Sequence, residues 1–247
     1  MAFSFQLYSA RNVQPWGAVF SQLAELGYAS VEGYAALTDQ ADDIAADLKT
    51  HGLTMPSAHF GLDALEQDLS RAVSQAKTLG VQRIFAPYID AADRPSDCAG
   101  WAGFAARLEA LSGPIRSEGL SFGWHNHDFE FAALPDGTVP MQVVLDEAPS
   151  ITWEADIAWI ARGGADPFEW IQRYGSRITS AHVKDIAPAG EALDEDGWAD
   201  VGHGTLDWPA LTTALREAGC DLFIAEHDNP SDLSRFAGRS IEAFKTF

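Results

Sequence analysis

The amino-acid sequence predicts an α/β protein that folds as one (β/α)₈ TIM barrel over residues 1–247. Three observations support this fold class. Short apolar runs alternate with segments of helical periodicity, glycines follow the helical segments, and polar residues stand at the ends of the apolar runs. The length also fits, because a barrel of this class needs about 250 residues.

Eight apolar runs have the length and composition of buried parallel strands. Several of them are continuously apolar rather than alternating, as expected for strands that are covered on both faces. The predicted strands are 3–8, 30–33, 55–59, 84–88, 120–125, 151–156, 178–182 and 222–226.

The segments between these runs have helical periodicity. In the first of them Val19, Leu23 and Leu26 stand at positions i, i+4 and i+7 and form one apolar stripe. Pro114 is expected to end or kink the fourth helix. The predicted helices are 16–26, 42–50, 64–79, 101–111, 167–174 and 209–218, and the glycines that suit their ends are Gly27, Gly52, Gly80, Gly119 and Gly219.

The positions of the polar residues favour a closed barrel over a doubly wound sheet. In a barrel the carboxyl ends of all strands meet at one face, where the active site is built. A doubly wound nucleotide-binding sheet usually has a G-x-G-x-x-G turn after its first strand, and residues 8–12 (YSARN) contain no glycine. The strand-end residues are Glu32, His59, His125, Glu154, Asp156, His182 and Glu226.

Composition excludes several classes of protein. The net charge of −20 argues against nucleic-acid binding, which needs an excess of lysine and arginine. Two cysteines, Cys98 and Cys220, are too few for a disulfide framework or a cysteine-rich zinc site. We find no signal peptide and no apolar run of about 18 residues, so we expect a soluble, cytoplasmic protein without membrane contact.

Four clusters at strand ends contain residues suited to chemistry. His125 and His127 stand in the sequence GWHNHDFE, where one ring could enter the barrel mouth. Glu154 and Asp156 share one face of a strand, and a cation beside them would relieve their mutual repulsion.

In the third cluster, His182 and Lys184 also share a face, and Lys184 could hold a substrate oxygen or neutralise Glu154. In the fourth, Glu226 ends a buried strand and needs a partner, because burying a bare carboxylate costs several kcal/mol. Together the clusters offer a mixed nitrogen and oxygen donor set that suits Mn²⁺, Zn²⁺, Co²⁺ or Fe²⁺.

Taken in order along the whole chain, these motifs resemble the sugar phosphate isomerase/epimerase family of xylose-isomerase-like TIM barrels. Any one motif is weak evidence, whereas six in the same order are specific. The matching segments are 5–11 (FQLYSAR), 124–131 (WHNHDFEF), 154–156 (EAD) with Trp159 and 163–167 (GGADP), 177–178 leading to 182–185 (HVKD), 201–208 (VGHGTLDW) and 226–228 (EHD).

The resemblance implies a single divalent metal held at the ends of strands five to eight. Asp156, His182 and Glu226 match the family's aspartate, histidine and last glutamate ligands. His125 stands where the family usually has a glutamate, and we take it as the fourth ligand while leaving that position open. Manganese is our first choice of metal, with zinc, cobalt, iron and magnesium as alternatives.

The resemblance and the residue types together predict proton abstraction next to a carbonyl group of a sugar, keto-sugar or polyol, leading to isomerisation or epimerisation. Tryptophans 16, 124, 153 and 159 could stack on a sugar ring. The predicted catalytic residues are Glu154, Glu226, His127 and Lys184, and the predicted substrate-binding residues are His59, Trp124, Arg11 and His203, which replaces a glutamate common among relatives.

Three alternatives remain at this point. Elimination of a β-oxygen substituent, as in a lyase or dehydratase, would begin with the same proton abstraction. A non-catalytic sugar-binding barrel would lack the metal, and a DNA-repair endonuclease is disfavoured by the seven histidines and the charge of −20. With only Lys184 and Arg11 expected near the mouth, the sequence favours an unphosphorylated keto-sugar or inositol derivative, and a homodimer is open.

Overall fold

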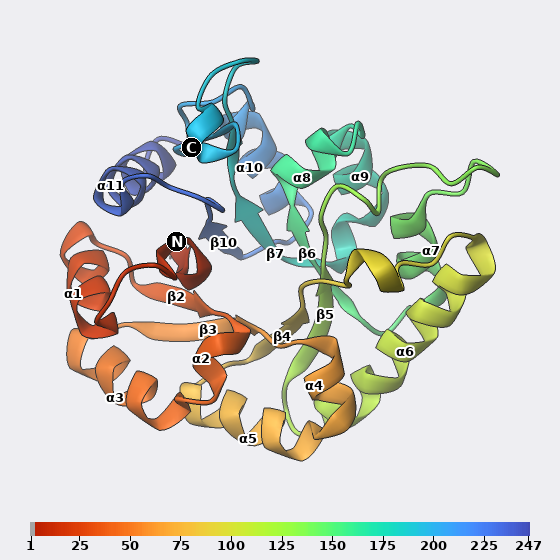
Figure 1. Ribbon diagram of the computed structural model, residues 1–247, viewed down its shortest axis with the longest axis horizontal. Helices are drawn as coiled ribbons and strands as arrows, with labels where there is room; N and C mark the ends of the chain where they lie inside the picture. Colours follow the sequence, from red (N-terminus) through yellow and green to blue (C-terminus); the bar gives the residue numbers. More distant parts are fainter. Residues whose placement is uncertain (1–2) are drawn as a thin grey trace.

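A closed barrel of eight parallel strands forms the centre of the protein (Figure 1). The structure is a computed structural model that describes residues 3–247. Around the ring the strands follow the order β1-β10-β7-β6-β5-β4-β3-β2, and β2 pairs with β1 to close it, so the predicted fold class is confirmed. The strands are β1 (Phe3–Gln6), β2 (Ser30–Gly33), β3 (Thr54–His59), β4 (Arg83–Ala86), β5 (Ser121–His125), β6 (Thr152–Asp156), β7 (Ile178–Val183) and β10 (Leu222–Ala225).

Helices surround the barrel on its outer side (Figure 1). Among residues 3–247, no helix combines the length and the hydropathy that crossing a bilayer requires. The helices are α1 (Trp16–Leu26), α2 (Ala35–Thr38), α3 (Ala41–His51), α4 (Leu62–Gln67), α5 (Leu69–Leu79), α6 (Cys98–Ser117), α7 (Pro140–Glu147), α8 (Ile157–Arg162), α9 (Pro167–Tyr174), α10 (Trp208–Glu217) and α11 (Leu233–Phe244), with 3₁₀ turns at Leu7–Ala10, Ala91–Asp93, Gly175–Arg177 and Leu193–Glu195.

Capping residues set the limits of α5. Its first turn is capped by Asp68, whose side chain accepts a hydrogen bond from the backbone N–H of Arg71 at 3.0 Å. This cap separates α4 from α5, so the single helix predicted over 64–79 is two helices. α5 ends at Gly80, whose φ of 79° is a left-handed conformation that glycine adopts without strain.

Pro114 was predicted to end or kink its helix, and the structure shows that it does not end it. Proline in a helix interior removes one hydrogen bond and costs about 3 kcal/mol. α6 nevertheless continues to Ser117, and its last turn buries Ile115 completely. Burial of this side chain against the barrel offsets the lost hydrogen bond.

The register of the strands sets the positions of the site residues. His125 of β5 pairs with Glu154 of β6, and Asp156 of β6 pairs with His182 of β7. Because side chains alternate along a strand, Glu154 and Asp156 share the inner face of β6, and Trp153 faces the helices. The strand-end side chains therefore point into the barrel in two neighbouring layers, one with His125 and Glu154 and the next with Asp156 and His182.

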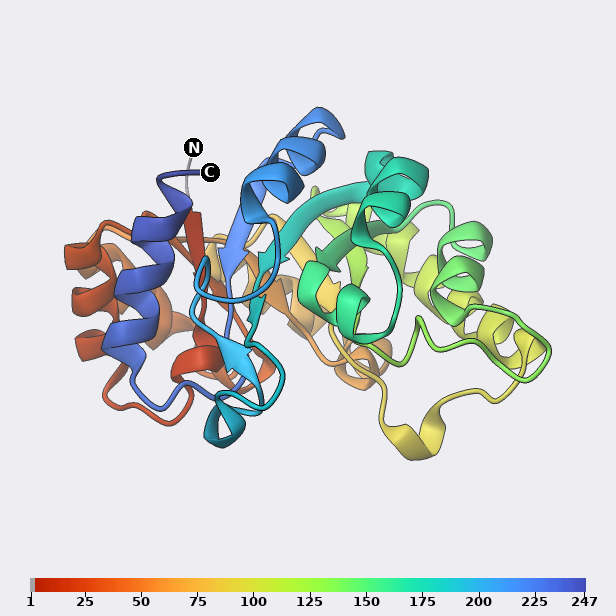
Figure 2. The same cartoon turned by 90° about the horizontal axis from the view of Figure 1, so that it is seen from above.

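Longer segments extend from the end of the barrel where these residues lie. Figure 2 shows that the segment between β4 and α6 and the segment between β7 and α10 extend to the same side. The second segment contains an antiparallel pair of short strands, β8 (Asp185–Ile186) and β9 (Trp198–Ala199). Both segments follow the carboxyl ends of barrel strands, which is the face where barrel enzymes build their sites.

Candidate metal centre and active site

Four side chains from neighbouring strands meet at the carboxyl end of the barrel. His125 ends β5, Asp156 ends β6, His182 lies near the end of β7, and Glu226 directly follows β10. Each offers one ligand atom, and the four atoms lie within 4.8 Å of one another. All four residues are buried. The structure thus brings together the whole set of predicted metal ligands.

The donor atoms of this group fit a metal ion. His182 Nδ1 lies 2.9 Å from Glu226 Oε2 and 4.0 Å from Asp156 Oδ2. His125 Nδ1 and Asp156 Oδ2 are buried and have no hydrogen-bond partner among the described residues. Leaving a buried polar atom unpaired costs about 1–3 kcal/mol, and a cation would satisfy both atoms. Two imidazoles and two carboxylates suit the divalent metals from manganese to zinc.

The carboxyl groups of this site have shifted pKa values. Burial raises the pKa of Asp156 to about 7, although the Lys184 ammonium partly opposes the shift. Burial would also raise the pKa of Glu226, but the neighbouring Lys184 and His182 lower it well below its usual value. Glu226 is therefore ionised at neutral pH and available as a ligand or a base.

Glu154 lies among three histidines beside this group. Its Oε2 is 2.6 Å from His59 Nε2, 3.2 Å from His125 Nδ1 and 3.3 Å from His182 Nε2. Of these three contacts, only the one with His59 has hydrogen-bond geometry. These four residues are a second set whose ligand atoms lie within 4.8 Å of one another. Glu154 is fully buried and does not line the cavity at the barrel mouth, so the geometry does not support its predicted role as a base in contact with substrate.

Glu32, at the end of β2, is a site residue to which the sequence analysis assigns no role. Its carboxylate accepts hydrogen bonds from Gln6 Nε2 at 2.8 Å and from the Ser57 hydroxyl, and its Oε1 lies 2.7 Å from His182 Nε2. Burial would raise the pKa of Glu32, but His59 and His182 lower it below its usual value. Its place among the strand-end polar residues is the only signal in the sequence.

Lys184 neutralises a different set of carboxylates from the one predicted. Its Nζ lies 2.6 Å from Asp228 Oδ1, 3.4 Å from Glu226 Oε2 and 3.9 Å from Asp156 Oδ2. It is fully buried and does not line the cavity. Lys184 therefore compensates charge beneath the site, and the geometry supports neither a substrate contact nor the predicted pairing with Glu154.

A cavity of about 570 Å³ lies at the mouth of the barrel and reaches the metal ligands. His125 and Glu226 of the ligand group line it, together with His59, as predicted for a substrate-binding residue. Aromatic and charged side chains make up most of the remaining wall. These are Tyr8, Tyr34, Tyr88, Phe129 and Trp159, with Arg94, His127, Asp128 and Asp228.

His127 lines this cavity and has a free ring nitrogen. Its Nδ1 has no hydrogen-bond partner among the described residues, and burial together with the Lys184 charge lowers its pKa to about 3. Its backbone N–H donates to Glu130 Oε2 at 2.9 Å, and Trp124 Nε1 donates to Glu130 Oε1 at 3.0 Å. Glu130, whose pKa burial raises to about 8, thus fixes the segment that carries His127, a role that the sequence analysis does not identify.

The structure does not support the predicted contact of Trp124 with a sugar, because Trp124 does not line the cavity. Its side chain is fully buried and packs edge to face on Phe104 of α6, with ring centroids 5.0 Å apart. Because His125 points into the barrel, its neighbour Trp124 must point toward the helices. Of the four tryptophans considered, only Trp159 lines the cavity.

Two further predicted substrate contacts lie outside the cavity. His203 is exposed and borders a separate surface pocket beside Arg235, Arg239 and the β8–β9 pair. Arg11 is partly buried and does not line the cavity, and its Nη1 donates to the backbone oxygen atoms of Tyr8 at 2.9 Å and Asp228 at 2.6 Å. Neither side chain is brought to the wall of the site.

Arg94 is the basic residue that does line the cavity, although the sequence analysis places only Lys184 and Arg11 there. Its guanidinium group lies 3.6 Å from the centroid of the Phe129 ring, and Nη2 donates to the Tyr88 hydroxyl at 2.8 Å. No motif marks Arg94, because it stands in the long segment between β4 and α6.

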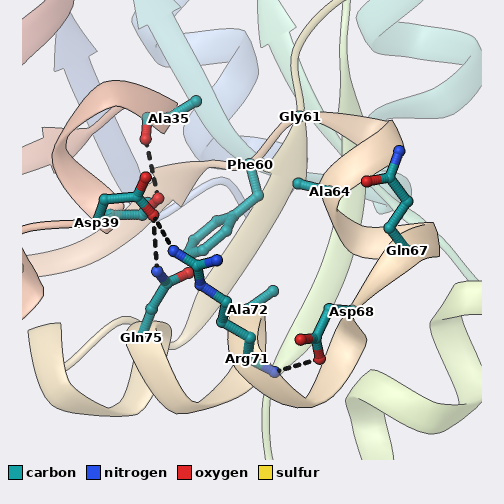
Figure 3. Close-up of a pocket in the computed structure, with 11 residues that line it drawn as sticks. Ala35, Asp39, Phe60, Gly61, Ala64, Gln67, Asp68, Arg71, Ala72 and Gln75 are labelled. Carbon is teal, nitrogen blue, oxygen red and sulfur yellow. Dashed lines mark hydrogen bonds and ion pairs between the residues drawn. The ribbon is translucent and has the colours of Figure 1, made fainter.

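A separate pocket of about 290 Å³ lies between α2, α4 and α5 (Figure 3). Its polar groups are paired with one another, since Asp39 Oδ1 accepts from Arg71 Nη2 at 2.8 Å and from Gln75 Nε2 at 3.1 Å. The Arg71 and Asp39 side chains are 61% and 71% exposed, and ion pairs of this kind contribute little. The cavity at the strand ends is therefore the candidate active site.

Comparison with solved structures shows the same fold in several proteins. A sugar phosphate isomerase/epimerase from Parabacteroides distasonis has a TM-score of 0.83 and 19% identity, over 98% of this chain and 92% of the other. The probable 3-DHS dehydratase AsbF of Bacillus anthracis, involved in petrobactin synthesis, has a TM-score of 0.79 and 13% identity, over 99% of both chains. An IolI protein with a bound zinc atom has a TM-score of 0.76 and 18% identity, over 100% of this chain and 96% of the other.

At these identities the solved structures establish the fold alone. No protein of curated function matches the sequence at a significant level. The model of the xylose isomerase-like TIM barrel family matches residues 20–247, which is most of the chain. The strand-end ligand group and the closed barrel agree with that match, and the chain belongs to the xylose isomerase-like TIM barrel family.

Proposed function

We propose that this protein is a divalent-metal-dependent isomerase or epimerase that acts on a sugar, keto-sugar or polyol by proton abstraction next to a carbonyl group. The observation that carries the proposal is the buried group of His125, Asp156, His182 and Glu226, which opens into a cavity of about 570 Å³. The fold that this chain shares with a sugar phosphate isomerase/epimerase and with a zinc-containing IolI protein supports it.

The four residues would hold one divalent ion, with manganese as first choice and zinc, cobalt, iron or magnesium as alternatives. When bound, such an ion supplies Lewis-acid polarisation of a carbonyl oxygen and its neighbouring hydroxyl. His125 suits this role because burial, with the neighbouring His182 charge, lowers its pKa well below its usual value and leaves its ring neutral. A neutral imidazole is the form of histidine that ligates metals.

Two cavity residues are placed to move protons. Glu226 lines the cavity, is ionised, and is held through Oε2 by His182 and Lys184, so it is our candidate base. His127 lines the same cavity with an unpaired Nδ1 and is our candidate for the second proton-transfer group. Return of the proton to the opposite face gives epimerisation, and return to the adjacent carbon gives isomerisation.

The walls of the cavity suit a polyhydroxylated substrate. Tyr34, Tyr88 and Trp159 offer aromatic faces to the C–H groups of a sugar, and the carboxylates of Asp128 and Asp228 can accept hydrogen bonds from hydroxyl groups. We therefore infer a small-molecule partner, and the net charge of −20 disfavours a nucleic acid.

The direct test is solvent deuterium exchange. Manganese-loaded protein is incubated with a panel of ketoses and keto-inositols in D₂O, and NMR follows deuterium incorporation at the carbon next to the carbonyl. Chelator-treated protein is the control. Metal-dependent exchange with an isomeric product supports the proposal, whereas exchange with loss of water would replace it with a dehydratase. Absence of exchange across the panel, despite bound metal, would contradict the proposed proton abstraction, and absence of both metal and exchange would favour a sugar-binding protein.

A further inference from the structure

His182 uses its two ring nitrogens on two different sets of carboxylates. Nδ1 faces the metal ligands, at 2.9 Å from Glu226 Oε2 and 4.0 Å from Asp156 Oδ2. Nε2 faces the opposite way, at 2.7 Å from Glu32 Oε1 and 3.3 Å from Glu154 Oε2. His182 and Glu32 are fully buried, so water does not compete for these contacts.

Glu32 is itself fixed in place from two neighbouring strands. Gln6 of β1 donates to its Oε1 at 2.8 Å, and the hydroxyl of Ser57 on β3 donates to its Oε2. His59 Nε2 lies 3.3 Å from the same Oε1, but its hydrogen bond goes to Glu154 at 2.6 Å. From β2 the carboxylate thus reaches across the barrel interior to β7, which is not a neighbour of β2 in the ring.

These contacts restrict the proton of the His182 ring. A neutral imidazole has one N–H donor and one acceptor nitrogen, and an ionised carboxylate can only accept. The charged ring has a proton on each nitrogen, so Nδ1 can donate to Glu226 Oε2 and Nε2 can donate to Glu32 Oε1. A metal ion would replace the proton on Nδ1, because only a nitrogen lone pair can ligate it. Nε2 would then keep its proton on Glu32, and the Nδ1 lone pair would face the metal beside Glu226 Oε2, which lies 2.9 Å away.

We propose that Glu32 is a positioning residue that holds His182 in its Nε2–H form and presents Nδ1 to the metal ion. This inference rests on the metal centre of the proposed function. It also decides between the two ligand sets of the barrel, because Nδ1 faces Asp156 and Glu226 and Nε2 faces the set that contains His59 and Glu154. Carboxylate partners of metal-bound histidines generally raise metal affinity about 10- to 100-fold.

The test begins with zinc affinity, measured by competition with a chromophoric chelator. Glu32→Gln keeps the shape of the side chain and an oxygen for His182, but it removes the charge. We expect one zinc per chain with affinity about 10- to 100-fold weaker than wild type. Asp200→Asn is the matched control, because it also replaces a buried carboxylate with an amide, and its partners Arg235 and Arg239 lie outside the ligand group. We expect its zinc affinity to be within about threefold of wild type.

The second measurement is long-range ¹H–¹⁵N NMR of the histidine rings in zinc-loaded protein, with the His182 signals identified by their loss in His182→Asn. We expect a proton on Nε2 and zinc on Nδ1, and we expect the Nε2–H signal to shift in Glu32→Gln. A merely structural role for Glu32 would leave the metal-bound nitrogen and the signal unchanged. Zinc on Nε2 would overturn the inference and place the metal in the set with His59 and Glu154.

The remaining outcomes are also decisive. If Glu32→Gln does not fold, Ser57→Ala removes one hydrogen bond to the same carboxylate, and we expect it to weaken zinc binding by several-fold. Affinity equal to wild type in the folded variant would overturn the positioning role while the metal centre stands. Failure of the wild-type chain to bind zinc or manganese would overturn the metal centre and this inference together.

Discussion

At the scale of single residues, the site is built on compensated charge. Lys184 Nζ lies 2.6 Å from Asp228 Oδ1, and His59 Nε2 lies 2.6 Å from Glu154 Oε2. Asp156 differs, because its Oδ2 has no hydrogen-bond partner among residues 3–247 and the nearest ammonium, that of Lys184, is 3.9 Å away. An unpaired buried carboxylate oxygen in a group with two imidazoles is suited to ligate a divalent cation.

Replacement of His127 tests the proposed proton transfer. We expect His127→Gln to lower kcat for the exchanging substrate by about 10²- to 10⁴-fold, the usual contribution of a positioned acid–base group. The metal content should not change, because His127 is outside the ligand group. His203→Gln is the control, and we expect its kcat to stay within about twofold of wild type because His203 lies outside the cavity. Equal losses in both variants would contradict the assignment.

The sequence predicts a site residue well when its residue type and its position in a motif are enough to suggest its role. His125, Asp156, His182 and Glu226 stand at strand ends in motifs, and the structure places them together. Glu32 is different. Its role depends on Gln6, Ser57 and His182, which are distant in the sequence and meet only when the barrel closes. Arg94 likewise reaches the cavity from a long segment that has no periodicity.

At the scale of elements, strand parity decides which side chains reach the site. His125 and Trp124 are adjacent on β5. Because the His125 side chain points into the barrel, the Trp124 side chain points outward and packs on Phe104. On β6 the same alternation brings Glu154 and Asp156 inward together, as the sequence predicts. The sugar contact proposed for Trp124 rested on its residue type alone. The alternation of side chains along β5 puts Trp124 on the outer face of the barrel, opposite to His125.

Helix limits were predictable where backbone conformation restricts the residue type. Gly80 ends α5 in the left-handed region, as its position ahead of a strand indicates. The division at Asp68 does not follow from the sequence, because an aspartate is acceptable inside a helix and favourable as a cap. Pro114 shows the limit of local rules, since α6 continues past it to Ser117 and buries Ile115 in that last turn.

Two glycine substitutions test this account of the helices. Gly80 has φ of 79° and open space around the added methyl, so Gly80→Ala should destabilise the fold by about 1–2 kcal/mol through backbone strain alone. Gly103 lies inside α6 with equally open space, so Gly103→Ala should stabilise the fold by about 0.5–1 kcal/mol. Calorimetry should give Tm shifts of opposite sign, at about 2–4 °C per kcal/mol. Tm shifts of the same sign in both variants would show that backbone conformation does not determine the effect of the added methyl group.

At the scale of the whole molecule, the barrel gathers acidic groups around the buried ammonium of Lys184. The chain has a net charge of −20, and Glu32, Glu154, Asp156, Glu226 and Asp228 meet at the carboxyl end of its strands with Lys184 as the ammonium among them. A divalent cation would lower the mutual repulsion of these carboxylates. Alternation of strands and helices predicted either a barrel or a doubly wound sheet, and the polar residues at the strand ends favoured the barrel.

Elemental analysis of the purified protein tests the central claim most directly. The protein is stripped with chelator, soaked separately in manganese and in zinc, and freed of excess metal before measurement. We predict about one ion per wild-type chain, and far less than one for Asp156→Ala with a similar Tm after chelation. No bound metal in the soaked wild-type protein, or one ion retained by Asp156→Ala, would contradict the metal centre described here.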